Sequence, residues 1–423
     1  MKEMLIFVDT KTNKNKFYQL ELIGDRVDVE YGRVGNSTPQ RRSYNGGQRM
    51  YDKKRAEKIK KGYVPSEIDV NIIEESSNSS SSGNIMDIAM AQIKTDDVSK
   101  KLIEKLVKQN IHNITANTKI KYDIDTGYFK TDLGIVTEKG VTKALTILDK
   151  IMTYQSRMGK LTDKKYDAFV KLNEQYFTII PTKISNLRDY KNLLITVNKV
   201  NEQLDICNSL SDSLKIIDAA KKDIKDKSSA KAVQEKVFDT SVYELTDKKE
   251  FTRLVKYFND SKNSRHGHNN YKVEKIYTVS LGKEESEYRK DLDNQMELFH
   301  GTKIANLLSI LKSGLLMPKQ SPGQTTGYMF GQGLYFASQS TKSLNYCDGM
   351  YWNSSAKQDK IYMFVADIAM GNYQIPSRSI SRNPDSIYDS YWAKPGQSGI
   401  QNDEMIIFKN NQIRLKYILE ITK

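Results

Sequence analysis

The spacing of apolar residues changes twice along the chain and divides it into three regions. In the first region, residues 16–23 and 27–31 alternate between apolar and polar positions, with Gly24-Asp25 between them. This alternation predicts a β-hairpin, because successive side chains of a strand point to opposite faces. Residues 49–61 then predict a short basic helix with few apolar positions.

The second region has helical spacing. Val98, Leu102 and Leu106 fall on one helical face, and the segment around Ala144 and Leu148 repeats the same period. This pattern predicts a bundle of amphipathic helices between residues 86 and 230.

From residue 237 onward, short aromatic and β-branched runs predict the strands of a largely antiparallel sheet. The clearest runs are residues 276–279, 334–337, 361–366, 405–408 and 415–419. The fold class that follows is multidomain α+β, with a small β-rich domain, an all-α helical bundle and a mixed α+β domain.

A polar segment from Ser76 to Gly83 has nothing to bury and predicts a flexible linker. Together with the changes in apolar spacing, this segment sets the expected domain boundaries. They are a first domain at 1–75, the linker at 76–84, the helical domain at 85–230 and the last domain at 231–423.

Positive charge is concentrated near the N-terminus. The 423 residues include 66 Lys and Arg against 52 Asp and Glu, which gives a net charge of +14. Between residues 38 and 64, nine basic residues stand against two acidic ones, so half of the excess lies in this segment. Because backbone phosphates provide most sequence-independent affinity, a phosphate-binding face is the favoured interpretation, and a solvated basic helix is the alternative.

Composition excludes several classes of protein. No apolar run approaches the about 20 residues that span a bilayer, and Glu3 and Asp9 interrupt any signal peptide, so we expect an intracellular protein without a membrane partner. Two cysteines and four histidines cannot build a disulfide scaffold or a set of zinc fingers, and we expect no metal. His266 and His268 lie in a polar loop without further ligands at metal spacing, which favours an ordinary loop, and Cys347 is interpreted as a packing residue.

Residues 31–35, Tyr-Gly-Arg-Val-Gly, together with the alternating strand before them, resemble a WGR domain over residues 1–65. The signature tryptophan of that family is Tyr31 here. The resemblance implies that Tyr31 and Arg33 contact a DNA end, and the alternative for Tyr31 is a structural position in the hairpin. The residues expected to bind the DNA phosphates are Arg41, Arg42, Lys53, Lys54 and Arg55.

Three short motifs in the last region carry the densest chemistry. They are His300-Gly301-Thr302, the block from Gly327 to Ala337, and Lys342-Ser343 followed by Tyr346. The pair of glycines in Gly331-Gln332-Gly333 does not fit a Rossmann turn, because it leads into an aromatic strand and not into a helix. We expect these glycines to let the backbone approach a flat ligand closely.

These motifs occur together and in order with a late glutamate, Glu404, and residues 237–423 strongly resemble the catalytic domain of poly(ADP-ribose) polymerases. Residues 172–181 and 133–151 are similar to the helical regulatory domain of the same family. The resemblance implies an ADP-ribosyltransferase that consumes NAD+ as its substrate and needs no metal.

The chemistry of NAD+ explains why one carboxylate suffices. Nicotinamide is a cationic pyridinium before it departs, so its departure needs no general acid, unlike the reaction of an ordinary glycosidase. A carboxylate bonded to the ribose 2′-hydroxyl stabilises the oxocarbenium-like charge and orients or deprotonates the acceptor. By match to the family motif Glu404 has this role, and His300 and Tyr335 complete the catalytic set.

The resemblance also implies contacts to NAD+. His300 is expected to bond the adenine-side ribose, and Gly301 and Ser343 are expected to bond the carboxamide. Tyr335 and Tyr346 are expected to stack on the nicotinamide ring, because aromatic faces suit a flat cation. The full expected set is His300, Gly301, Thr302, Asn306, Tyr335, Phe336, Ala337, Lys342, Ser343 and Tyr346.

The sequence therefore predicts a poly(ADP-ribose) polymerase without zinc fingers that is activated by DNA strand breaks and acts in the DNA damage response. Its expected partners are 5′-phosphorylated DNA ends or nicks and protein acceptors including itself. We expect a monomer that is nuclear in a eukaryote and cytoplasmic otherwise. The alternatives are a mono-ADP-ribosyltransferase, because Asn402 stands where some elongating members have an aromatic residue, and an inactive DNA-end-binding adaptor.

Overall fold

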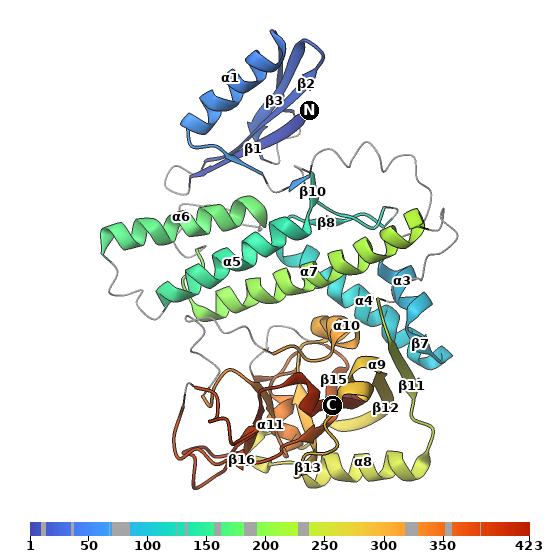
Figure 1. The fold of residues 1–423 in the computed structure, drawn as a ribbon. Helices are drawn as coiled ribbons and strands as arrows, with labels where there is room; N and C mark the ends of the chain where they lie inside the picture. The colour runs from blue at the N-terminus through green and yellow to red at the C-terminus, as the bar shows by residue number, and fades with distance from the viewer. Residues whose placement is uncertain are drawn as a thin grey trace. The chain divides into compact units, whose positions relative to one another are not determined.

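The computed structural model describes residues 1–9, 14–34, 38–66, 68–69, 85–124, 126–131, 134–155, 162–181, 193–226, 237–317, 329–351, 358–380 and 382–423. The predicted linker at 76–84 and residues 327–328 of the glycine block lie outside this set. The chain forms two compact units (Figure 1). Unit 1 comprises Met1–Ile85 and Ile111–Lys225, and unit 2 comprises Met86–Asn110 and Asp226–Lys423.

The elements of unit 1 are β1 (Lys2–Asp9), β2 (Lys14–Ile23), β3 (Arg26–Arg33), β4 (Gln40–Asn45), α1 (Gly47–Lys60), β5 (Val64–Pro65), β6 (Ile68–Asp69), β8 (Lys121–Tyr122), β9 (Phe129–Thr131), β10 (Gly134–Val136), α5 (Glu138–Gln155), α6 (Asp163–Ile179) and α7 (Val197–Asp226). Helix α4 (Asp97–Asn117) runs from unit 2 into unit 1.

The elements of unit 2 are α3 (Ile85–Gln92), β7 (Lys94–Thr95), β11 (Thr240–Glu244), α8 (Lys248–Asp260), β12 (Lys272–Leu281), α9 (Gly282–Glu287), β13 (Gln295–Gly301), α10 (Ile304–Ser313), β14 (Leu334–Phe336), α11 (Ser340–Leu344), β15 (Ile361–Ala369), β16 (Tyr373–Gln374), β17 (Ser390–Ala393), β18 (Glu404–Ile407) and β19 (Ile413–Thr422). Two 3-10 turns are added, Ser264–His266 and Asn410–Gln412.

The N-terminal part of unit 1 is an antiparallel sheet with the strand order β4-β3-β2-β1-β5. The predicted hairpin is confirmed, since β2 and β3 pair along their length and Gly24 turns the chain with φ 58°. The alternation of apolar residues puts Leu20 and Val29 on one face, where they pack with Tyr51 of α1. The predicted basic helix is α1, and it covers this face of the sheet.

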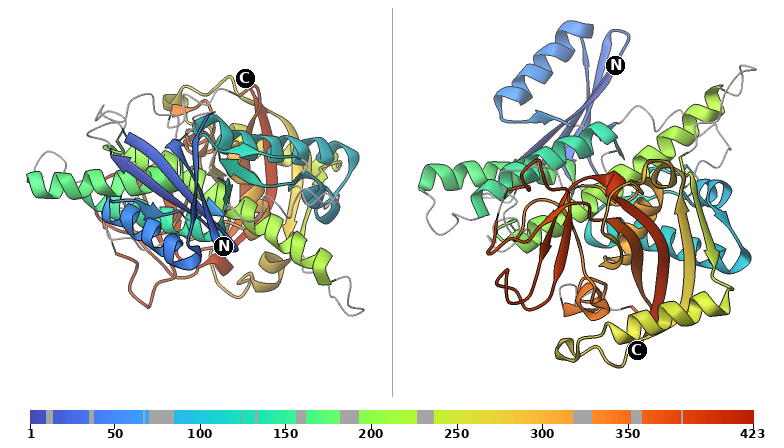
Figure 2. Two further views of the ribbon diagram at one scale, coloured as in Figure 1. Left: turned by 90° about the horizontal axis from the view of Figure 1, so that it is seen from above. Right: turned by 60° about the horizontal axis from the view of Figure 1, so that its bottom comes forward.

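The helical part of unit 1 is built on α5, α6 and α7, which lie side by side (Figures 1 and 2). The hydroxyl of Tyr176 on α6 donates to Gln203 Oε1 of α7 at 2.9 Å. The sequence predicted an all-α bundle here, and the structure adds a small sheet with the order β6-β10-β9-β8. Its strands are two or three residues long, which is too short for a period to show in the sequence.

Unit 2 contains the predicted antiparallel strands, which form two sheets. The larger has the order β13-β15-β19-β12-β11-β7 and the smaller has the order β14-β18-β17-β16. The last strand of the chain, β19, lies between β15 and β12 in the larger sheet (Figure 2). A single bridge between Phe299 of β13 and Ala337, with N···O distances of 3.0 and 3.1 Å, joins the two sheets.

The edge of the larger sheet is closed by a segment from early in the chain. Strand β7 pairs with β11 in parallel. Gln92 Oε1 accepts hydrogen bonds from the backbone N–H of Val237 and Phe238 at 2.8 and 3.0 Å. Asp96 Oδ2 accepts from the Glu244 N–H at 2.7 Å. Residues 86–110 are therefore part of the hydrogen-bonded structure of unit 2.

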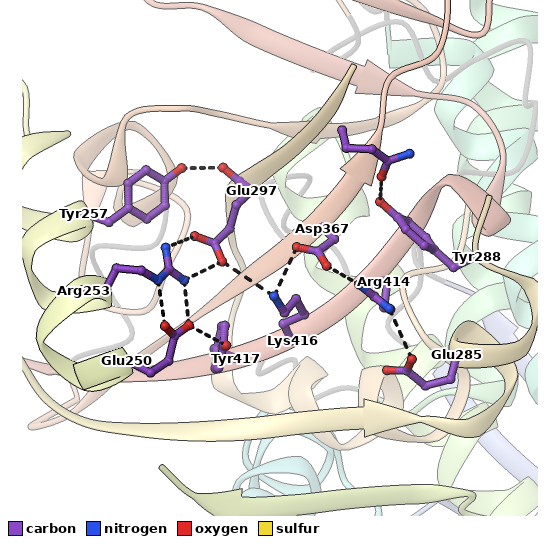
Figure 3. Close-up of polar contacts among 11 residues, drawn as sticks. Glu250, Arg253, Tyr257, Glu285, Tyr288, Glu297, Asp367, Arg414, Lys416 and Tyr417 are labelled. Carbon is purple, nitrogen blue, oxygen red and sulfur yellow. Dashed lines mark hydrogen bonds and ion pairs between the residues drawn. The ribbon is translucent and has the colours of Figure 1, made fainter. Parts of the chain in front are cut away.

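A chain of ion pairs runs from α8 across strands β13, β19 and β15 of the larger sheet (Figure 3). Arg253 of α8 bonds Glu250 of the same helix and Glu297 of β13, with N···O distances of 2.8 Å to each. From Glu297 the chain continues across the sheet to the side chains of β19 and β15 (Figure 3). The hydroxyl of Tyr257 donates to the Glu297 carbonyl as well. These contacts fix the position of α8 against β13.

Glu284 on α9 is a partly buried carboxyl that makes the stability of the protein depend on pH. Its Oε2 accepts the Leu415 N–H at 2.7 Å, but burial outweighs this bond and raises its pKa from 4.5 to about 7. Between these two values the folded protein keeps a proton that the unfolded chain has lost, so stability falls as pH rises. Above about pH 7 the cost amounts to about 3 kcal/mol.

We expect Glu284→Gln to remove this pH dependence, because an amide keeps the oxygen that accepts the Leu415 N–H and carries no charge. In urea unfolding of the full chain, the wild type and the variant should have equal free energies of unfolding at about pH 4.5. At about pH 8 the free energy of unfolding of the variant should be higher by up to about 3 kcal/mol. Glu287→Gln, at an exposed position of the same helix, is the matched control. Parallel stability profiles for the wild type and Glu284→Gln would contradict the prediction.

Candidate active site

The predicted motifs meet where the two sheets of unit 2 join. The Phe299–Ala337 bridge places His300-Gly301 beside the end of β14. Helix α11 follows β14 after three residues, and its residue Ser343 donates its hydroxyl to the Phe299 carbonyl at 2.9 Å. Two β-strands and one short helix thus bring together segments from the His-Gly-Thr, glycine-block and Lys-Ser motifs.

His300 is held in one tautomer. Its Nδ1 lies 2.9 Å from the Tyr335 carbonyl, which can only accept, so Nδ1 carries a proton and donates it. Burial lowers the pKa of His300, so the imidazole is neutral at pH 7. Its ring lies 5.2 Å from the ring of Phe336. In this tautomer Nε2 is unprotonated and can accept a hydrogen bond from a ribose hydroxyl.

Tyr335 and Glu404 project from the same face of the smaller sheet. Tyr335 of β14 is opposite Ile406 of β18, and Glu404 is two residues before Ile406 on that strand. Because side chains alternate between faces, Glu404 and Tyr335 are diagonal neighbours on one face. The Tyr335 hydroxyl is engaged within the protein, where it donates to the Gly331 carbonyl and accepts the Phe330 N–H, both at 2.9 Å.

Glu404 forms an ion pair with Lys342 of α11, with an Nζ···Oε1 distance of 2.7 Å. The side chains are 21% and 13% exposed, so the pair is shielded but reachable. Burial opposes the charge on Lys342, but the charge and hydrogen bond of Glu404 outweigh it and raise the pKa of Lys342. The Lys342 ammonium also lies 5.8 Å from the ring centre of Tyr346, which is half exposed. The arrangement places the Glu404 carboxylate and the Lys342 ammonium beside an aromatic surface.

Gly301 lies in contact with α11. A Cβ at this position would be 1.8 Å from the Ser343 carbonyl oxygen, so only glycine permits the approach of β13 to the helix. The Ser343 hydroxyl already donates to the Phe299 carbonyl and has to rotate to donate to a carboxamide. Thr302 Oγ1 accepts from Asn306 Nδ2 at 3.1 Å, so these two predicted residues form a pair just after Gly301.

The paired glycines of the block lie close to the protein's own backbone. A Cβ on Gly333 would lie 2.5 Å from the Ile407 carbonyl oxygen, and one on Gly331 would lie 2.8 Å from the Arg382 carbonyl oxygen. Gly331 has φ 86°, which disfavours any other residue. The close approach that these glycines allow in the structure is to the protein's own backbone, including β18. Their approach to a flat ligand stays a prediction.

The loop at 263–268 is the part of this site that the sequence analysis missed. It was interpreted as an ordinary loop, but His266 Nδ1 lies 2.8 Å from Thr341 Oγ1 and His268 Nε2 lies 2.6 Å from Asn345 Oδ1. Both partners flank Lys342 on or directly after α11. The only sequence signal is two histidines in a polar loop, and no local pattern reveals which segment they contact.

Neither a metal centre nor a cysteine nucleophile is supported here. Among the residues that the structure describes, no group of three or more His, Cys, Asp or Glu side chains is arranged to hold a metal ion. Burial raises the pKa of Cys347 to about 12, so its thiol is not ionised near pH 7. Cys347 is buried in the core of unit 2, as its interpretation as a packing residue requires.

Within the same described part of the chain, no helix is long and apolar enough to cross a membrane.

The predicted DNA-binding residues of the N-terminal sheet are divided between its two faces. Tyr31 is opposite Gln40, and Val29 is opposite Arg42, so Tyr31 and Arg42 project from the face that α1 covers. The guanidinium of Arg42 lies 5.9 Å from the ring centre of Tyr31. Arg33 follows Tyr31 by two residues on β3 and shares this face. Arg41 projects from the opposite face.

Three of the predicted basic residues have carboxylate partners within the domain. Arg41 pairs with Glu30 at 3.0 Å and Lys54 pairs with Glu57 at 3.4 Å. Arg55 makes two bonds to Glu3, at 2.8 and 3.1 Å. These partners reduce the charge that the three residues offer to a phosphate, whereas the exposed Lys53 has no ion-pair partner among the described residues.

Lys58, which was not predicted as a site residue, lies closest to the aromatic cluster of this face. Its ammonium lies 4.1 Å from the ring centre of Tyr18, 5.8 Å from that of Tyr31 and 5.4 Å from that of Tyr63. Burial and then the neighbouring Lys61 lower the pKa of Lys58. Tyr31 is therefore both a core neighbour of α1 and part of a cationic surface.

Comparison with known proteins agrees with these two regions. The family model of the WGR domain matches residues 1–69, and the model of the Poly(ADP-ribose) polymerase catalytic domain matches residues 248–399. The second match includes His300, Tyr335 and Lys342 and ends before Glu404.

A putative poly [ADP-ribose] polymerase-like protein, 100L of Invertebrate iridescent virus 6, is 32% identical over 35% of this chain and 86% of its own length. The chain belongs to the poly(ADP-ribose) polymerase family. Other members of the family are similar over more of the chain. Poly [ADP-ribose] polymerase 2 of Zea mays is 23% identical over 77% of the chain, and poly [ADP-ribose] polymerase of Drosophila melanogaster is 25% identical over 87%.

The chain spans 54% of the maize poly(ADP-ribose) polymerase and 37% of the Drosophila one. Family membership, the WGR domain and the mixed α+β fold are thus established.

Proposed function

We propose that the protein is an NAD+ ADP-ribosyltransferase that releases nicotinamide and elongates ADP-ribose chains on protein acceptors. The observation that carries this proposal is the Glu404–Lys342 ion pair of 2.7 Å on the sheet face that Tyr335 shares. Family membership through the catalytic-domain match supports it. A carboxylate in a shielded site stabilises a cationic ribose in the transition state.

The proposed reaction breaks the bond between ribose C1′ and the nicotinamide nitrogen. Nicotinamide leaves with the bonding electron pair and becomes neutral, and an acceptor oxygen forms the new bond to C1′. When the acceptor is a hydroxyl, its proton passes to Glu404 and from there to water. Lys342 holds the Glu404 side chain in place for that step through their ion pair, and His300 Nε2 accepts a hydrogen bond from the ribose on the adenine side.

The N-terminal domain suggests how this activity is controlled. We propose that DNA strand breaks, with 5′-phosphorylated ends or nicks, bind the face that carries Tyr31, Arg33 and Arg42 and activate the transferase. The WGR match and the concentration of basic residues between 38 and 64 support this assignment. Such control fits an enzyme of the nuclear response to DNA damage.

Nicked DNA should raise the rate of nicotinamide release from NAD+ by about tenfold or more, because an activating ligand typically supplies 1–3 kcal/mol of coupling. Arg33→Ala should weaken this response and lower its dependence on salt, since one phosphate or sugar contact is removed. The measurement is release of labelled nicotinamide at several DNA and salt concentrations.

Arg41→Ala is the matched control, because Arg41 projects from the opposite face and already pairs with Glu30. It should leave the DNA response close to that of the wild type. Equal rates with and without DNA would contradict activation by DNA and leave the transferase activity in place. Absence of turnover at saturating DNA would instead favour an inactive DNA-end-binding adaptor.

A further inference from the structure

Asn263, in the loop after α8, uses every hydrogen-bonding group that it has. Its backbone N–H donates to Thr341 Oγ1 at 2.9 Å. Its side-chain Nδ2 donates to Gln339 Oε1 at 3.2 Å and to Asn402 Oδ1 at 3.1 Å. Its Oδ1 accepts the Arg265 N–H at 3.1 Å. One amide side chain thus connects segments 76 and 139 residues away.

Both of those segments carry one member of the proposed catalytic ion pair. Thr341 directly precedes Lys342 on α11, and Asn402 lies two residues before Glu404, where β18 begins. The Lys342–Glu404 contact closes a ring that runs from Asn263 through α11 to β18 and back. We infer that Asn263 is a positioning residue that sets the distance between Glu404 and Lys342. This inference rests on the proposed function for the role of that pair.

The support of Asn263 is itself rigid. At the C-terminal end of α8, the Phe258 carbonyl accepts from Ser340 Oγ at 2.7 Å, and Ser261 Oγ accepts the Ser340 N–H at 3.2 Å. Ser340 is fully buried at the start of α11. The ion-pair chain of Figure 3 holds the middle of α8 through Arg253. Asn263 therefore projects from a fixed element.

His266 completes the hydrogen-bonded ring. Its Nδ1 lies 2.8 Å from Thr341 Oγ1. Thr341 is fully buried, so the loss of a partner here leaves a polar group that water cannot satisfy. Thr341 is also a partner of Asn263, which makes Asn263 and His266 parts of one network.

Aspartate is the most informative replacement for Asn263, because it matches the amide in size but cannot donate. Asn263→Asp removes both side-chain donations and places a negative oxygen against Gln339 Oε1 and Asn402 Oδ1. We expect kcat for nicotinamide release to fall by about ten- to a hundredfold, as misplacement of a reacting group typically costs. The KM for NAD+ should change by less than about twofold, because Gly301 and Ser343 keep their contacts.

A double-mutant cycle separates positioning from a general structural role. In the Glu404→Gln background, Asn263→Ala should have no further effect on kcat, because the group that Asn263 positions is already lost. Equal losses in both backgrounds would overturn the inference. Asn402→Ala should lower kcat as Asn263→Ala does, and the two changes together should cost no more than either alone.

Amide hydrogen exchange of the full chain tests the same network without any activity. Asn263→Ala should increase exchange in residues 339–346 and 401–405, and unchanged exchange in both segments would overturn the inference. Asn270→Ala, at an exposed position of the same loop, is the matched control and should leave both readouts unchanged. If the wild type consumes no NAD+, the proposed function fails, and the exchange measurement still decides whether Asn263 orders these segments.

Discussion

Glu404→Gln should lower the rate of nicotinamide release by about a hundredfold, and it should lower chain elongation further. A neutral amide stabilises the cationic ribose less than a carboxylate does, and removal of one such group from a shielded site costs about two to three orders of magnitude. Elongation also needs a base for an acceptor hydroxyl, which glutamine does not provide. Nicotinamide release and product length on a gel with labelled NAD+ measure the two effects.

The neighbouring carboxylate offers a matched control for this change. Both oxygens of Asp403 lie 2.8 Å from the Ser338 hydroxyl and not against Lys342. Asp403→Asn should therefore change either rate by less than about threefold. Single units on the acceptor with wild-type protein would establish a mono-ADP-ribosyltransferase, and an unchanged rate in Glu404→Gln would exclude Glu404 from the chemistry.

Gly301→Ala should destabilise unit 2 and abolish binding of nicotinamide analogues. The added Cβ would lie 1.8 Å from the Ser343 carbonyl oxygen and 2.7 Å from its carbonyl carbon, so β13 and α11 have to separate. Overpacking of this kind costs about 3 kcal/mol, and here it displaces the backbone that the carboxamide is expected to bond. Thermal unfolding and calorimetry with benzamide, which carries the same carboxamide on a six-membered aromatic ring, measure the two effects.

Gly282→Ala tests whether the effect is specific to this contact. A Cβ at Gly282 meets the side-chain carboxylate of Asp239, which can move, and no backbone atom. We expect a smaller loss of stability and normal benzamide binding for this control. Normal binding in Gly301→Ala would show that the carboxamide is not held between β13 and α11.

The periodic elements of this fold were predictable because burial on one face requires apolar residues at regular spacing in the sequence. The alternation in 16–23 and 27–31 gave β2 and β3, and the apolar period around Leu102 and Leu106 gave α4. Both leucines are buried. The strands within residues 334–337 and 405–408 were predictable from their short runs of aromatic and β-branched residues. The short strands β8, β9 and β10 were not, because two or three residues show no period.

The site could be predicted only where its residues are close in sequence. Gly301 and Ser343 were expected from motifs, and the structure brings them into contact through segments that the sequence could not pair. Asn263 was missed because its partners lie 76 and 139 residues away and asparagine is common in loops. Arg55 was expected at a phosphate, yet its partner Glu3 is 52 residues earlier in the chain.

Strand β7 has a practical consequence for anyone who isolates the transferase. A fragment that begins at residue 231 would leave β11 as an open sheet edge, because β7 pairs with Ser241 and Val242. Such a fragment would also lack Gln92 and Asp96. Their side-chain oxygens accept the hydrogen bonds of the Val237, Phe238 and Glu244 N–H groups in the full chain. Unpaired edges recruit strands from other molecules, so such a fragment should self-associate, whereas one that also includes residues 85–110 should remain dispersed.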